Sequence, residues 1–176
     1  MTELDDLVKK IRENLDIFRV GRGIKSRDII EDFFKDKYGV EDMPSSVIDF
    51  YTNFDGIAFS TVGDVFSIIP NDNVDDYEEM LTETIMNEFL ESIGLSNDEY
   101  HFFFIGSDGM GGYYAIRTDT GDDRVYWLDH EFPEKFKEAL DSGTYDNAMV
   151  FENFNAFLDS MLEDTITIER EDMQDF

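Results

Sequence analysis

The chain has 176 residues, of which 14 are Lys or Arg and 42 are Asp or Glu, so its formal net charge is −28 with both histidines neutral. This length is typical of one domain with a self-sufficient core, and 17 Phe, 8 Tyr and 41% apolar residues exclude a disordered acidic tail. The absence of Cys excludes a disulfide framework, a thiolate zinc site and a cysteine nucleophile.

The charge is unevenly distributed. Residues 1–40 hold nine basic and nine acidic side chains, whereas the remaining 136 hold five basic and 33 acidic ones. Between Lys37 and Arg117 there are 16 carboxylates and no Lys or Arg. Such a surface repels nucleic acid and anionic membranes, because phosphate binding needs cationic side chains. It is expected to attract a basic partner.

The N-terminal segment alternates charged and apolar residues at helical spacing and has no uninterrupted apolar region of a secretory signal. No stretch approaches the roughly 20 apolar residues that a membrane span needs. We therefore expect a cytoplasmic protein that does not bind a membrane.

Helical spacing of apolar residues predicts three helices in the N-terminal third of the chain. They are expected over residues 4–18, from Ser26 to a Gly39 C-cap, and from Pro44 to the Asp55-Gly56 pair.

Short β-branched and aromatic runs then predict strands, separated by turns rich in Gly and Asp. Helical spacing returns over residues 74–93, weakly over 134–140 and strongly over 151–162. The expected strands are 57–61, 65–69, 100–105, 113–117 and 125–128. No strand–helix–strand alternation is sustained, so the order predicts an α+β fold in which helices flank an antiparallel meander sheet.

No repeat or long linker divides the chain, so we expect a single domain over 1–176, with an N-terminal helix in 1–25 and an acidic tail in 163–176. In the tail, Thr165 to Ile168 alternates like an edge strand. Its six acids fit a frayed chain end equally well.

Two histidines limit the catalytic possibilities. His101 leads into a strand, which favours a structural role, and His130 lies between Asp129 and Glu131. A His–carboxylate pair can act as a general base, but no recognisable nucleophile motif accompanies it. We expect no enzymatic activity.

Two loops have superficial features of ligand sites. The Gly106–Gly112 turn lacks the spacing and the lysine of a phosphate-binding loop, so a hairpin turn is preferred. The acidic run from Asn71 to Asp76 lacks the Gly and Glu positions of an EF-hand, and Asp72 is better explained as a carboxylate at a helix N-terminus. No metal or other cofactor is expected.

Four segments, taken in order, resemble the SUKH superfamily. The helix from Met43 to Gly56 resembles the family's opening motif, with Met43 where Leu is usual and Asp55 where Asn is common. The run from Phe104 to Tyr114 resembles its glycine-rich hairpin. Val125 to Glu131 resembles a strand end that closes on Asp-His-Glu, and Phe154 to Leu162 resembles its last helix. The resemblance covers about residues 27–162.

The resemblance implies a non-catalytic α+β domain that serves mostly as a bacterial immunity protein, binding and neutralising toxins, many of them nucleases. A fungal branch of the family regulates cell-wall assembly. We therefore expect an immunity protein that occludes a basic nuclease with an acidic surface. The alternative is a regulatory or scaffold module that docks cellular proteins. The partner's identity and the oligomeric state stay open.

The candidate contact residues are acids in turns and at strand ends, with two aromatic anchors. If helices cover only one face of the sheet, some aromatic side chains are left exposed, and Trp127 is then the best single anchor. The candidate partner-binding residues are Asp108, Tyr113, Asp122, Asp123, Trp127, Asp129 and Glu131.

Overall fold

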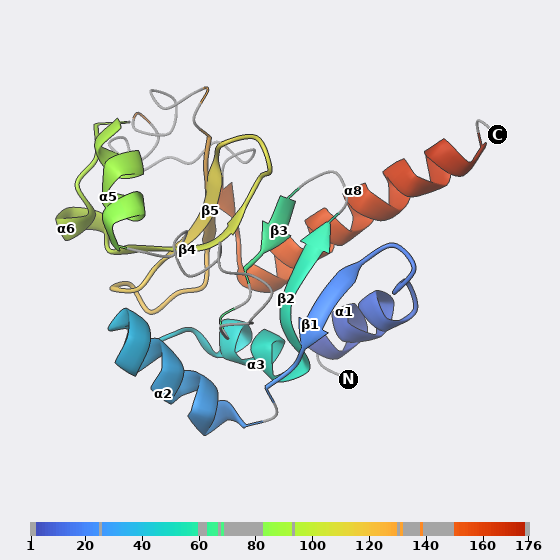
Figure 1. The fold of residues 1–176 in the computed structure, drawn as a ribbon, viewed down its shortest axis with the longest axis horizontal. Coiled ribbons are helices and arrows are strands. Elements are labelled where there is room, and N and C mark those ends of the chain that lie inside the picture. Colours follow the sequence, from blue (N-terminus) through green and yellow to red (C-terminus); the bar gives the residue numbers. More distant parts are fainter. Residues whose placement is uncertain are drawn as a thin grey trace.

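The computed structural model describes residues 3–24, 26–59, 63–66, 68, 83–92, 94–129, 131, 138 and 150–174. Within this part of the chain, six helices surround one seven-stranded sheet (Figure 1). The helices are α1 (Glu3–Arg12), α2 (Arg27–Tyr38), α3 (Ser45–Asn53), α5 (Glu83–Ser92), α6 (Asn97–Tyr100) and α8 (Phe154–Gln174). The strands are β1 (Arg19–Arg22), β2 (Phe54–Phe59), β3 (Gly63–Val65), β4 (Phe102–Ser107), β5 (Tyr113–Arg117), β6 (Val125–Leu128) and β7 (Val150–Phe151).

The sheet is a simple meander. Its strand order is β1 to β7, and each strand pairs antiparallel with its neighbours in the sequence. The predicted α+β class and the single domain are confirmed, and β5 and β6 have the predicted bounds. Tyr113 pairs with Leu128, so the β5 start and the β6 end lie at the same end of the sheet.

Local sequence signals explain the ends of α2 and α3. The Ser26 side chain accepts a hydrogen bond from the Ile29 amide at 3.4 Å, and Gly39 ends α2 at φ 69°. After Pro44, α3 ends at Asn53 rather than at the predicted Asp55-Gly56 pair, because Phe54 already has extended backbone and begins β2.

The N-terminal segment is shorter in helix than predicted. The expected helix 4–18 ends at Arg12, and the unpredicted strand β1 pairs with β2. At Gly21 and Gly23 a side chain would collide with the backbone of the Asn53–Asp55 segment. The four residues of β1, Arg-Val-Gly-Arg, include one glycine and two exposed arginines and lack the apolar–polar alternation that usually marks a strand.

The C-terminal tail is neither an edge strand nor a separate segment. Residues 163–174 continue α8, with Thr165 and Ile166 buried. Neither this helix nor any other described helix is long and apolar enough to cross a membrane.

The middle of the chain contains three further differences from the prediction. Tyr100 ends the unpredicted helix α6, so β4 begins at Phe102 instead of residue 100. The strand β7 was not predicted, because it has only two residues. Within the expected helix 74–93, α5 covers 83–92 and the earlier part lies outside the described residues, as do the 71–76 loop and, apart from Glu138, the helix 134–140.

Helices cover both faces of the sheet, so the condition under which aromatic side chains would be left exposed is not met. On one face Phe103 packs edge-on against Phe34 of α2, and Tyr114 packs against Phe157 of α8. On the other face Phe104 packs edge-on against Phe89 of α5. Phe102 to Ile105 are therefore all buried in the core.

Candidate functional site

The structure divides the predicted contact residues between the two ends of the central strands. Asp108, Tyr113, Trp127, Asp129 and Glu131 lie at the end where β4 leads into β5 and where β6 finishes. Asp122 and Asp123 lie at the opposite end, in the turn from β5 to β6. The seven residues therefore do not form one patch.

At the first end, Asp108 organises the turn between β4 and β5. The Met110 and Gly112 amides donate to its Oδ1 at 2.8 and 2.9 Å, and the Trp127 indole N–H donates to its Oδ2 at 3.0 Å. Only 8% of Asp108 is exposed. Hydrogen bonds from three donors compensate the burial of a carboxylate, so Asp108 chiefly shapes the turn.

The turn holds an apolar side chain out in solvent. Gly109 and Gly111 have φ values of 74° and 103°, a conformation that favours glycine. Between them, Met110 is 73% exposed, the largest exposed fraction among the large apolar side chains described. Since Asp108 fixes the backbone on both sides, Met110 is presented from a preorganised loop.

A second aspartate joins β3 to this end of the sheet. Asp64 Oδ1 accepts hydrogen bonds from the Ser107 amide and hydroxyl, both at 3.1 Å. Gly63, at φ 104°, allows this approach, because any side chain there would collide with the Ser107 carbonyl oxygen.

The phenol of Tyr114 is buried at this end of the sheet, and nearby carboxylates affect its pKa. Burial comes first among the causes that raise the pKa of Tyr114, followed by the negative charges of Asp108, Asp164, Asp129 and Asp64. These four acids come from β3, the β4–β5 turn, the end of β6 and α8.

Asp129 and Glu131 continue this cluster beyond β6. The Glu131 amide donates to Asp129 Oδ1 at 2.9 Å; Asp129 is only 8% exposed, whereas the Glu131 side chain is exposed. We call Asp64, Asp108, Asp129, Glu131 and Asp164 the acidic end of the sheet. The segments 63–66, 106–114, 127–131 and 161–165 that carry it contain no Lys or Arg.

The two predicted aromatic anchors are partly buried beside the acidic end. Tyr113 stacks on Phe104 with ring centroids 4.8 Å apart, and burial, then Asp108, raises the pKa of its phenol. Trp127 lies near Tyr114 and is held by its bond to Asp108. Both are half-exposed rather than free surface side chains, so each has a structural role as well as an accessible edge.

At the opposite end, Asp123 connects elements that are distant in sequence. Its Oδ2 accepts a hydrogen bond from the Ser46 hydroxyl at 2.6 Å and another from the Phe154 amide at 3.3 Å. It therefore supports the first turns of α3 and α8. Asp122 accepts from the Arg124 amide at 3.1 Å, as in an Asx turn.

The described part of the site consists of carboxylates, partly buried aromatic side chains and the exposed Met110. Within the described residues, no group of three or more acids or histidines is placed to hold a metal ion. His101 is exposed at φ 50°, and its carbonyl oxygen accepts from the Thr118 amide and hydroxyl. His130 lies outside the described residues.

Met110, Asp64 and Asp164 were missed as site residues at the sequence level. The flanking Gly109 and Gly111 were a usable signal for an exposed tip. Nothing local in the sequence shows that Asp64 and Asp164 approach Asp108, because they belong to distant elements.

Comparison of the chain with protein-family models, with curated proteins and with solved structures finds no match. The resemblance to the SUKH superfamily therefore stays a prediction.

Proposed function

We propose that this chain is an immunity protein that binds and neutralises a cationic protein toxin, most simply a nuclease, and that the acidic end of the sheet contacts it. The observation that supports the proposal is that hydrogen bonds hold Asp64, Asp108 and Asp129 at one end of the sheet beside the exposed Glu131, in segments without Lys or Arg. The SUKH resemblance and the net charge of −28 agree with it.

The mechanism is occlusion. A nuclease must present Lys and Arg to hold its phosphate substrate, and a carboxylate-rich surface placed over them blocks access. Opposite charges also steer the encounter, so association is expected to reach roughly 10⁸ M⁻¹ s⁻¹ or more at low salt.

Met110 gives this surface an apolar centre. Interfaces usually bind through a few apolar or aromatic anchors surrounded by a polar rim. Met110 is exposed on a fixed turn, and the acids of the sheet end lie next to that turn. Met110 is thus expected to contribute to residence time and the acids to association rate.

Co-expression with the product of a neighbouring toxin-like reading frame, scored for survival of the host, tests the function. We expect the wild-type chain to rescue growth and to form a complex with the purified toxin. Failure of a well-folded, abundant chain to do either would exclude the immunity role and favour a regulatory binding module.

Charge reversal tests the contact surface in the same complex. Glu131→Lys should slow association about threefold or more at low salt, whereas Glu152→Lys, a reversal beside β7 at the opposite end, should leave the rate nearly unchanged. Both side chains are exposed. Equal effects would show that the toxin senses only total charge.

Removal of the apolar side chain tests the anchor. Met110→Ser should raise the dissociation rate about tenfold, given the usual value of burying such a side chain. Leu15→Ser is the matched control, since Leu15 is 53% exposed elsewhere. Equal dissociation rates for wild type and Met110→Ser would show that the toxin does not contact this turn.

A further inference from the structure

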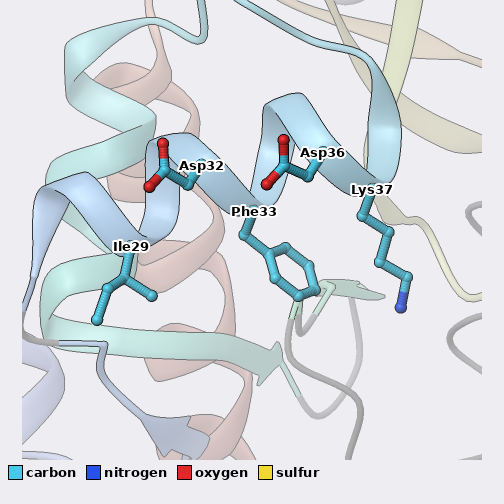
Figure 2. Close-up of a pocket in the computed structure, with 5 residues that line it drawn as sticks. All are labelled: Ile29, Asp32, Phe33, Asp36 and Lys37. Atoms are coloured by element: carbon cyan, nitrogen blue, oxygen red, sulfur yellow. The ribbon is translucent and has the colours of Figure 1, made fainter.

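A second surface, on the outer side of α2, has the form of a docking site. Ile29, Asp32, Phe33, Asp36 and Lys37 line an open hollow of about 570 Å³. Figure 2 shows the two carboxylates along one flank of the helix, and Ile29, Phe33 and Lys37 along the other. The five side chains come from two consecutive turns of one helix.

Of the two apolar residues of this hollow, Phe33 packs partly against the core and Ile29 is left largely exposed. The sequence of α2 contains two adjacent apolar rows, and the fold buries only Ile30 and Phe34. Ile29 remains 59% exposed, although a large aliphatic side chain gains about 1.5–3 kcal/mol from full burial. Phe33 is half-buried, and Lys37 Nζ lies 5.3 Å from its ring centroid.

The two carboxylates on the other flank of α2 also lack a partner of opposite charge in the part of the chain described. Asp32 and Asp36 are both exposed and lie four positions apart. Like charges at this spacing repel each other, and neither aspartate forms an ion pair with another residue of the part of the chain described. A cation bound across both would relieve the repulsion.

The charge of the whole molecule decides between a second copy and a different partner. Two chains of net charge −28 repel each other, which disfavours self-association through this face. A cationic helix fits better, because its own Lys or Arg residues four positions apart have the same spacing along the axis as Asp32 and Asp36. Its apolar row would then lie on Ile29 and Phe33.

We propose that the outer face of α2 binds an amphipathic cationic helix of a partner protein, with its apolar row on Ile29 and Phe33 and its cations on Asp32 and Asp36. This surface is separate from the acidic end of the sheet, and the proposal does not depend on the immunity role.

A labelled synthetic peptide tests the proposal directly. The probe is a helix of about 18 residues built from Leu and Lys with Leu at helical spacing, long enough to be helical when bound. A peptide with Glu in place of Lys is its control. Fluorescence anisotropy gives the dissociation constant, and amide chemical shifts locate the bound peptide. We expect the Lys peptide alone to bind, with shifts concentrated in α2.

Matched variants distinguish binding of the peptide at α2 from long-range attraction of the peptide to the acidic chain. Ile29→Ser should weaken binding about tenfold, while Leu15→Ser, at a similarly exposed position, should change it less than about twofold. The double variant Asp32→Asn/Asp36→Asn should weaken binding more than Glu88→Gln/Glu91→Gln, which removes the same charge from exposed positions of α5. Thermal melts confirm that each variant is folded.

Three outcomes would overturn the proposal. One is no effect of Ile29→Ser on peptide binding. Another is equal weakening by the two charge-removal pairs, which would show only long-range attraction. The third is sedimentation of the free chain as a dimer that Ile29→Ser dissociates, which would make a second copy the occupant. None of these outcomes bears on rescue from the toxin.

Discussion

At the scale of single residues, carboxylates that look alike in the sequence have different tasks. Asp108 is buried and receives three hydrogen bonds, Asp123 joins α3 to α8, and Glu131 is exposed. A turn aspartate can be predicted to bond its own loop. Its bond to Trp127, 19 positions away, could not, because that contact depends on the strand register.

Asp108→Asn provides a sharp test of the turn. The amide oxygen can still accept from the two backbone N–H groups, but its NH₂ would face the Trp127 N–H, so one partly buried donor loses its acceptor. We expect a loss of about 1–3 kcal/mol in the free energy of unfolding. Denaturant unfolding followed by the emission of Trp127, the only tryptophan, measures it.

Asp42→Asn, at an exposed position, is the control for Asp108→Asn. Its free energy of unfolding should stay within about 0.5 kcal/mol of the wild-type value. An unchanged midpoint and emission maximum in Asp108→Asn would show that the Trp127 bond contributes nothing.

Tyr114 makes stability sensitive to alkali. Burial and the surrounding aspartates raise its folded-state pKa above the ordinary value of 10.0. As pH rises past 10.0 the unfolded chain loses this proton and the folded chain keeps it, so stability falls. The loss should approach about 1.4 kcal/mol per pH unit for this group.

Tyr114→Phe should remove the contribution of Tyr114 to the fall of the unfolding free energy with pH. The Tyr114 hydroxyl donates a weak hydrogen bond to Met161 Sδ at 3.7 Å, and loss of this bond should change stability at neutral pH little. Unfolding free energies measured between about pH 8 and 11 check both statements, and parallel curves for variant and wild type would refute the first.

At the scale of elements, hydrophobic spacing predicted the long and regular pieces. The α2 caps, β5 and β6 were expected where they occur, because glycine, serine and alternating apolar residues act locally. The strands β1 and β7 are short and gain their backbone partners from other segments, and α6 has only four residues. Such tertiary stabilisation leaves no periodic trace in the sequence.

Lys10 connects α1 to α8. Its ammonium group donates to Asp159 and Glu163, each at 2.7 Å. Partial burial lowers the pKa of Lys10, but the bonds to both carboxylates outweigh it, so the pKa is raised. Lys10→Gln should destabilise the fold by about 0.5–1 kcal/mol, since the groups remain partly exposed to solvent.

Lys9→Gln is the matched control, because it removes the same charge from α1, while in the described part of the chain Lys9 pairs only with the neighbouring Glu13, just beyond the helix, at 3.9 Å. The difference between the two variants should shrink in about 1 M salt. Urea midpoints that are equal at low salt would contradict a stabilising link between the helices.

At the scale of the whole molecule, charge is the dominant property. With a net charge of −28, the compact state contains more self-repulsion than the expanded chain. The sequence predicted this imbalance fully. It did not predict how strands and helices gather five of the acids at one end of the sheet, because that depends on how distant elements come together.

Added salt should raise the melting temperature. Screening of about 1 kcal/mol of repulsion corresponds to a shift of about 2–4 °C for a chain of this size. Calorimetry from low salt to about 0.5 M NaCl measures it, and KCl should give the same shift if screening is the cause. A flat or falling melting temperature would show that repulsion is a minor term.

The meander order of the sheet also determines how the molecule can be assembled as it is synthesised. Every strand pairs with the strand before it in the sequence, so pairing can advance with the growing chain, although only the β2–β3, β4–β5 and β5–β6 connections are short. α1 is the exception, since its Lys10 partner in α8 lies 149 positions later. The contact between α1 and α8 can therefore form only after α8 has been synthesised. This contact closes the domain after the strands have paired.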